Sequence, residues 1–147
     1  LMAWYKKKNV PAKVIAVTGS TGKTSTKDML RYVLNERFKT YGSIRNNNVQ
    51  VKIGINLQRI TDDCQVYIQE IGGGRPGGAS RHSRMVLPEM SIITNIGTAH
   101  IGNYDSQLEL LKNKMGITDG MDIDGVLYLN GDDELLANVK TPRSTLR

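Results

Sequence analysis

The chain is poor in features that define several large classes of proteins. It holds one cysteine, Cys64, so a disulfide within the chain is excluded. The β-forming residues that follow Cys64 indicate a buried thiol rather than a nucleophile, and we expect a reducing, cytoplasmic setting. No apolar run approaches the roughly 20 residues that cross a bilayer, and no signal-peptide core is present near residue 1. We therefore expect neither a membrane span nor secretion.

Aromatic residues are also scarce, at 5% of the 147 residues, and this affects how the net charge of +6 is interpreted. Basic chains often bind nucleic acid, but few rings are available here to stack on bases. The basic residues form one run only, Lys6 to Lys8. We expect no nucleic-acid partner, because a substrate with several phosphates explains the charge better. The 39% of hydrophobic residues is enough to bury the core of one domain.

The most informative segment is 14–26, where an apolar, β-branched run leads into a glycine loop that ends in Gly-Lys-Thr. We interpret it as a strand followed by a phosphate-binding loop. Gly19 and Gly22 permit backbone angles closed to other residues, so that successive N–H groups can turn inward around phosphate oxygens. Lys23 adds a cation and Thr24 adds a hydroxyl ligand for Mg²⁺, while the following helix N-terminus favours the same anion.

This loop is shorter than the general P-loop, which would place a glycine where the chain has Val17. A glycine-rich turn with an exposed lysine is the alternative interpretation. The preceding strand and the following amphipathic pattern argue against it. That pattern predicts a helix from Lys23 to Arg37. Its predicted apolar face consists of Met29, Leu30, Val33 and Leu34.

Strand and helix patterns alternate through the rest of the chain. This alternation predicts an α/β fold with a P-loop, in which a mostly parallel sheet is flanked by helices and ligands bind at the carboxyl ends of the strands. The further predicted strands are Gln65 to Ile71, Met90 to Ile96 and Gly125 to Leu129. The further predicted helices are Ala79 to Leu87 and Ser106 to Gly116, the second with a core face of Leu108, Leu110, Leu111 and Met115.

Polar residues follow each predicted strand at its carboxyl end. Glu70 follows one strand, Thr94 to Gly97 follow the next with His100 just beyond, and Asn130 to Asp133 follow the last. Any one of these residues alone is typical of an ordinary solvated surface. Parallel strands bring their carboxyl ends to one edge of the sheet. We therefore expect these polar residues to converge beside the glycine loop and to hold phosphate and metal.

These spaced motifs resemble the central, ATP-binding domain of the Mur ligases, which are cytoplasmic amide-forming enzymes of peptidoglycan precursor synthesis. The similarity covers most of the chain, and the stretch 70–77 is most similar to the branch that adds D-alanyl-D-alanine to UDP-muramoyl tripeptide. The chain departs from that branch at Thr21, Gly78 and Glu134, and by a few extra residues between 48 and 53. The matching segments are Thr18 to Thr24, Glu70 to Gly72, Thr94 to His100, Lys114, and Asn130 to Asp133.

The resemblance implies a mechanism in which ATP phosphorylates a carboxylate and an amine attacks the acyl phosphate to form an amide. It implies that Lys23, His100 and Lys114 are catalytic, and that the ligands of two Mg²⁺ ions are Thr24, Glu70, His100 and Lys114. It further implies a set of nucleotide-binding residues: Thr18, Gly19, Ser20, Thr21, Gly22, Lys23, Thr24, Ser25, Asn130 and Asp133.

Lys114 is chemically unusual in this set, since a cationic amine repels Mg²⁺. In the family the matching lysine is carbamylated by CO₂, which makes it an anion. The alternative is an exposed helical lysine beside Lys112.

The family has three domains, so the resemblance implies that this chain is part of a longer enzyme. The UDP-muramoyl peptide and the incoming amino acid or dipeptide would bind through domains outside it. Three other functions stay open at this point. They are another ligase of the superfamily, such as a folylpolyglutamate or cyanophycin synthetase, a non-catalytic P-loop nucleotide-binding module, and a kinase-like phosphotransferase.

Overall fold

The computed structural model describes residues 12–44, 50–97, 101–142 and 144–146. Three sequence predictions lie outside this part of the chain: the lysine run Lys6 to Lys8, the insertion that begins near Asn48, and the candidate metal ligand His100.

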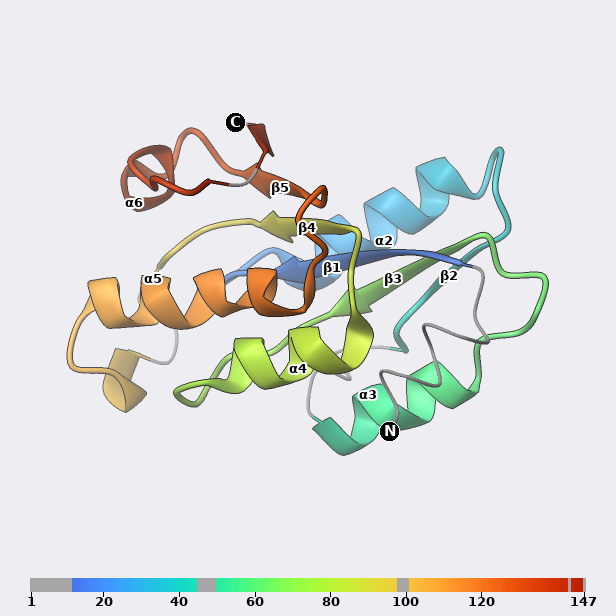
Figure 1. Ribbon diagram of the computed structural model, residues 1–147, viewed down its shortest axis with the longest axis horizontal. Helices are drawn as coiled ribbons and strands as arrows, with labels where there is room; N and C mark the ends of the chain where they lie inside the picture. Colours follow the sequence, from blue (N-terminus) through green and yellow to red (C-terminus); the bar gives the residue numbers. More distant parts are fainter. Residues whose placement is uncertain (1–11, 45–49, 98–100, 143, 147) are drawn as a thin grey trace.

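A six-stranded sheet forms the centre of the molecule, and each of its paired strands runs parallel to its neighbour (Figure 1). The strand order is β2-β3-β1-β4-β5-β6, so β1 lies between β3 and β4. The prediction of a parallel α/β sheet is confirmed. The strands are β1 (Lys13–Thr18), β2 (Thr40–Gly42), β3 (Val66–Glu70), β4 (Met90–Ile93), β5 (Val126–Leu129) and β6 (Thr145–Leu146).

The four predicted strands are present, but β4 ends three residues earlier than predicted, at Ile93. The residues that follow leave the sheet to contact the glycine loop. Strands β2 and β6 were not predicted, because segments of three and two residues are too short to show a period of two.

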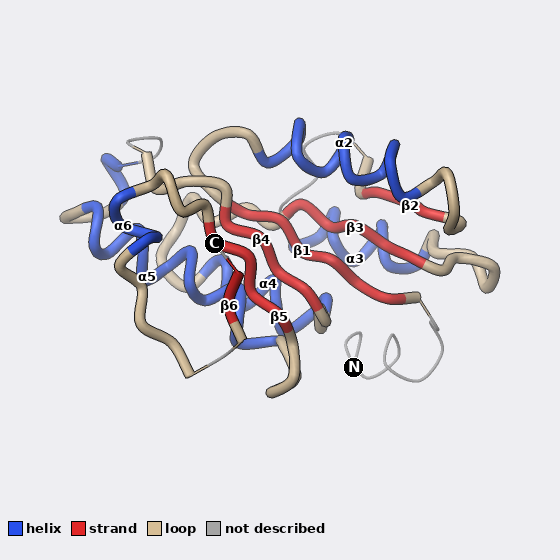
Figure 2. Tube along the Cα trace, turned by 90° about the horizontal axis from the view of Figure 1, so that it is seen from above, coloured by secondary structure: helices blue, strands red, loops and turns tan. Residues whose placement is uncertain are grey.

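Helices cover both faces of the sheet. Helix α2 (Lys23–Leu34) lies on one face, and α3 (Gln50–Gln58), α4 (Gly78–Val86) and α5 (Gln107–Met115) lie on the other (Figure 2). Helix α3 was not predicted, because its pattern is only weakly amphipathic and its inner face includes Gly54 and Asn56. Shorter elements complete the fold: η1 (Ile101–Asn103), η2 (Gly116–Gly120) and α6 (Glu134–Ala137).

The core is divided between these two faces. Val14 and Ala16 of β1 pack toward α3, α4 and α5, whereas Ile15 and Val17 pack toward Leu30 and Leu34 of α2. Because side chains alternate along a strand, a strand covered on both faces is apolar at every position. This explains the continuous apolar run that made β1 easy to predict.

The predicted inner face of α2 is partly wrong. Met29 and Val33 are 69% and 65% exposed, and the side chain that lies fully inside is Lys27, which is 2% exposed. The inward positions are Lys27, Leu30 and Leu34, spaced at i, i+3 and i+7. A lysine with an apolar stem can occupy such a face when its ammonium has a partner, so hydropathy alone selected the wrong stripe.

The predicted core face of α5 is wrong at one position, Leu108. Leu110 is fully buried and Leu111 and Met115 pack against the core, but Leu108 is 59% exposed. Ser106 caps the helix by accepting a hydrogen bond from the Glu109 N–H.

Cys64 is buried, as predicted, and its thiol donates to the carbonyl of Val66. Burial raises the pKa of this thiol, which makes it a poor nucleophile at neutral pH. Among the described residues, no helix has the length and apolar character that a membrane span requires.

The contact between η2 and α4 leaves no room for a side chain at Gly120. The Gly120 N–H donates to the Ser83 hydroxyl at 3.0 Å, and a Cβ built on Gly120 would lie 2.1 Å from the Ser83 carbonyl oxygen. Backbone atoms of a packed helix cannot move aside as a flexible side chain can.

We therefore expect Gly120→Ala to lower the free energy of unfolding by about 3 kcal/mol through overpacking. Urea unfolding followed by circular dichroism measures the change. The matched control is Gly102→Ala, since a Cβ on Gly102 has no described atom within 4 Å. Equal stability of the two variants would contradict this account of the contact.

Candidate functional site

The glycine loop connects β1 to α2 at the carboxyl edge of the sheet. Gly19 has φ 147° and Gly22 has φ 76°, so both adopt backbone conformations that favour glycine. A Cβ on Gly19 would also lie 1.9 Å from Oγ1 of Thr94. The predicted need for glycine at both positions is confirmed.

Residues that follow β4 hold the loop in place. Oδ1 of Asn95 accepts hydrogen bonds from the N–H groups of Ser20 and Thr21 at 3.1 and 3.0 Å. The Asn95 amide also donates to the Thr21 hydroxyl at 2.6 Å, and Oγ1 of Thr94 donates to the Thr21 carbonyl at 2.6 Å. Thr94 and Asn95 are thus a support for the loop. Sequence reasoning placed them at the correct edge but not in this role.

The start of α2 is arranged to receive an anion. The N-cap is Gly22, which provides no side-chain cap, and the first turn contains no acidic residue. The first intrahelical bond runs from the Thr26 N–H to the Gly22 carbonyl, so the amides before Thr26 have no partner within the helix. The Lys23 ammonium lies within the loop, where it donates to the carbonyls of Gly19 and Ser20, each at 3.0 Å. Amide dipoles and a cation therefore meet at one point.

Thr24 and Glu70 lie together beside this helix start. The Thr24 hydroxyl donates to Oε2 of Glu70 at 2.7 Å, and Glu70 is 1% exposed at the end of β3. No group of three or more acidic, histidine or cysteine side chains that could enclose a metal occurs among the described residues. Mg²⁺ does not need such a cage, since it commonly takes one or two protein oxygens and completes its shell with phosphate and water. The Thr24–Glu70 pair fits that requirement.

Other predicted nucleotide-binding residues have structural contacts here. Thr18 is fully buried and its hydroxyl donates to the Ile71 carbonyl at 2.9 Å. Asp133 caps α6 by accepting from two backbone N–H groups at 3.0 Å, and its other oxygen accepts from the Ile96 N–H at 2.7 Å. Oδ1 of Asn130 accepts from the Asp132 N–H at 3.0 Å. Contact of these three residues with a nucleotide stays a prediction.

Lys114 is not an exposed helical lysine. It is 1% exposed on α5, and a Cβ built on Gly73 would lie 3.4 Å from its Nζ. Burial, with a smaller effect from the positive charge of Lys23, lowers the pKa of Lys114 to about 8. About a tenth of such amines is neutral at pH 7, far more than for an ordinary lysine.

A cavity of about 510 Å³ lies between Lys23 and Lys114. None of its described lining residues carries a carboxylate, so the cavity is strongly cationic and suits an anionic ligand. Sequence reasoning did not select Arg75, Arg81 or His82, although all three follow the predicted strand end. Burial lowers the pKa of His82, and its Nδ1 lies 3.1 Å from the Gly72 carbonyl oxygen. The lining residues are Lys23, Gln50, Gly72, Gly73, Gly74, Arg75, Gly78, Arg81, His82, Asn103 and Lys114.

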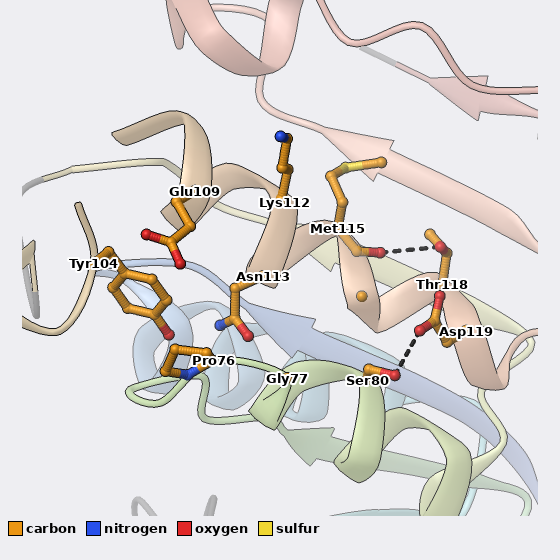
Figure 3. A pocket seen from close by; sticks show the side chains of 11 residues that line it. Pro76, Gly77, Ser80, Tyr104, Glu109, Lys112, Asn113, Met115, Thr118 and Asp119 are labelled. Carbon is orange, nitrogen blue, oxygen red and sulfur yellow. Dashed lines mark hydrogen bonds between the residues drawn. The ribbon is translucent and has the colours of Figure 1, made fainter. Parts of the chain in front are cut away.

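A second cavity, of about 450 Å³, lies between the start of α4 and helix α5 (Figure 3). Asn113 and Tyr104 line it, and both donate to the Gly73 carbonyl, at 2.9 and 2.5 Å. Figure 3 shows these two side chains directed toward Pro76. The glycine segment after β3 is thereby held from the α5 side, which fixes the wall of the cationic cavity next to Lys114.

Comparisons with known proteins identify a family that the chain matches in sequence and in fold. A family model described as the Mur ligase middle domain matches residues 17–145. The UDP-N-acetylmuramoyl-tripeptide--D-alanyl-D-alanine ligase of Bacillus subtilis (strain 168) is 33% identical over 126 residues, which cover 86% of this chain and 28% of that protein. The chain therefore spans less than a third of that relative's length.

Two solved structures resemble the chain closely. MurF from Acinetobacter baumannii superposes with a TM-score of 0.87 at 31% identity, over 93% of this chain and 30% of that one. MurF ligase from Thermotoga maritima, solved in complex with ADP, superposes with a TM-score of 0.89 at 25% identity, over 98% of this chain and 34% of that one.

The buried amine of Lys114 predicts a characteristic pH dependence of stability. Below about pH 8 the amine is protonated in both the folded and the unfolded chain, so the full cost of burying its charge opposes folding. Between about pH 8 and pH 10.5 the unfolded chain binds more protons at this amine than the folded chain does. The cost of burying the charge therefore falls as the pH rises through this range. Lys114→Met should raise the free energy of unfolding by up to about 3 kcal/mol at pH 7 and by progressively less toward pH 10.

Urea unfolding at pH 7, 8.5 and 10 measures this difference. The control is Lys112→Met, which removes an exposed lysine two residues away. If the Lys114→Met difference stayed constant with pH after subtraction of the control, the folded amine would have an ordinary pKa.

Proposed function

The chain belongs to the Mur ligase family through its middle domain, and on that premise we propose that it is the nucleotide-binding part of an ATP-dependent amide-forming ligase. The observation that carries the proposal is the Thr24–Glu70 pair beside the uncapped start of α2. Hard oxygen ligands and free helix amides at one edge are the requirements of a magnesium–nucleotide site. The Bacillus subtilis relative is named as a ligase of UDP-N-acetylmuramoyl-tripeptide and D-alanyl-D-alanine, and we propose the same substrates for the complete enzyme.

In this proposal the loop from Gly19 to Thr24 holds the β- and γ-phosphates of ATP. Lys23 supplies a cation at that point, and the α2 amides supply hydrogen bonds to phosphate oxygens. Thr24 and Glu70 would hold Mg²⁺, which on binding offsets the charge of the phosphates. A carboxylate of the substrate takes the γ-phosphoryl group, and an amine displaces the phosphate to form the amide. The cationic cavity beside Lys23 would bind and orient that carboxylate.

Lys114 has a role in this proposal as a carbamate. Carbamate formation needs a neutral amine, and the lowered pKa of Lys114 provides one near neutral pH. The product is an anion among Lys23, Arg75 and Arg81, whose charges would stabilise it. The carbamate and His100 would then hold a second Mg²⁺, and this part rests on the family resemblance alone. The cytoplasmic location and the lack of a nucleic-acid partner also stay predictions.

A non-catalytic nucleotide-binding module would use the same loop. It would have no need for a buried amine between a phosphate loop and a cationic cavity, and burying that amine opposes folding. The position of Lys114 therefore favours the ligase. A kinase-like phosphotransferase would normally have the full-length P-loop, whereas this chain has Val17 in place of its first glycine.

Nucleotide binding tests the proposal directly. Lys23→Ala should weaken the binding of ADP with Mg²⁺ at least about tenfold, because a charge-assisted contact to phosphate contributes about 1.5–3 kcal/mol. Isothermal titration calorimetry measures the affinity. The control is Lys13→Ala, which removes an exposed lysine at the opposite end of β1. Equal affinities in the wild type and Lys23→Ala would exclude the role assigned to the loop.

A further inference from the structure

Helix α2 contains a buried cation, Lys27, that has no role in the proposed chemistry of the Thr24–Glu70 pair. Lys27 is 2% exposed on α2, one turn beyond Thr24. Its ammonium donates to the Ser43 carbonyl at 2.9 Å and lies 3.4 Å from a carboxylate oxygen of Asp28. A buried charge is unfavourable unless it is well bonded, and a leucine or methionine would fill the same space without that cost. The ammonium therefore has a purpose other than packing.

Ser43 connects Lys27 to Glu70, the proposed metal ligand. It is 3% exposed just after β2, and its Oγ accepts a hydrogen bond from the Glu70 N–H at 3.1 Å. The Ser43 N–H in turn donates to the Ile68 carbonyl at 2.8 Å, which ties the residue to β3. Glu70 completes the route through the 2.7 Å bond that its carboxylate accepts from Thr24.

These bonds form a closed circuit that begins and ends on α2. Thr24 and Lys27 are three residues apart, so they face the same side of the helix, and one holds the side chain of Glu70 while the other holds Ser43. The circuit crosses from α2 to the end of β2, from there to the end of β3, and back to α2. Every member is buried or half-buried, so water competes weakly for the bonds.

We propose that Lys27 is a positioning residue, which acts through Ser43 to hold the Glu70 carboxylate against Thr24 in the geometry that binds Mg²⁺. This inference rests on the proposed nucleotide site, to which it adds a residue that neither the motif nor the family resemblance selected. Without the ammonium, the Ser43 carbonyl would be left buried with one bond fewer, and both Ser43 and the Glu70 backbone would gain freedom. Because Glu70 is the proposed metal ligand, its less precise position would weaken the binding of Mg²⁺ rather than the binding of phosphate.

Lys27→Met distinguishes a positioning role from a purely electrostatic one, because the two predict opposite changes in the affinity for Mg²⁺. Removing a cation near a metal site should by itself tighten Mg²⁺ binding. Loss of positioning should weaken it. We expect the Mg²⁺ concentration for half-maximal ADP binding to rise at least about fivefold, while ADP affinity in EDTA stays within about twofold of the wild type. Calorimetric titrations at several Mg²⁺ concentrations measure both quantities.

A second measurement needs no nucleotide. Hydrogen exchange followed by NMR reports the opening of single amides, and Lys27→Met should speed exchange at Ser43 and Glu70 about tenfold. Exchange at Ile92 should not change, because Ile92 lies in β4, which is separated from β3 by β1. The matched control is Arg31→Met, which removes an exposed cation one turn further along α2. Unchanged exchange at Ser43 and Glu70 in a folded Lys27→Met variant would overturn the proposal.

Ser43→Ala tests the route without changing any charge. It removes the acceptor of the Glu70 N–H and should raise the Mg²⁺ requirement as Lys27→Met does, so it also carries the test if Lys27→Met fails to fold. In the double variant the two effects should not add, since the two bonds are successive steps of one route through Ser43. Additive effects, or a Mg²⁺ requirement that is unchanged or lowered in both single variants, would show that Lys27 does not act through Ser43. If the wild type bound no nucleotide, the proposed function would fail, while the exchange measurement would still decide the role of Lys27.

Discussion

Parallel pairing of β1 with both β3 and β4 is the constraint on which the rest of the site depends. Val17 pairs with Glu70 on one side and with Ile92 on the other, so the three strands reach the same edge together. The glycine loop, the Glu70 carboxylate and the Asn95 amide meet there without any long side chain having to reach across. A strand order that separated β1 from β3 would leave the same sequence motifs without a common site.

Cations are concentrated at this edge and are held by different means. Lys23 donates to carbonyls of its own loop, and Lys27 is bonded to a carbonyl at the end of β2. Lys114 is buried beside Gly73, and its low pKa reflects the cost of that position. Positive charge arranged in advance attracts polyanionic ligands and stabilises charge that develops on phosphate, at the expense of stability in the free protein.

The predictions succeeded where local chemistry decides the outcome and failed where packing decides it. The glycines of the loop were correctly interpreted because a positive φ is a property of one residue and its neighbours. Met29 and Val33 were placed inside wrongly, because which helix stripe faces the sheet depends on how α2 docks. The supporting role of Asn95 and the burial of Lys27 were missed for a related reason, since their partners lie 74 and 16 residues away in sequence.

By itself the sequence determined the class of fold, the four longer strands and the need for glycine at positions 19 and 22 of the loop. These follow from periodicity and from backbone chemistry that acts over a few residues. Only the tertiary structure decided that Lys114 is buried with a lowered pKa, that Asn95 supports the loop, and that Lys27 is joined to Glu70 through Ser43. Burial and hydrogen bonding between distant segments arise when the strands pair and the helices pack, and the order of residues along the chain does not display them.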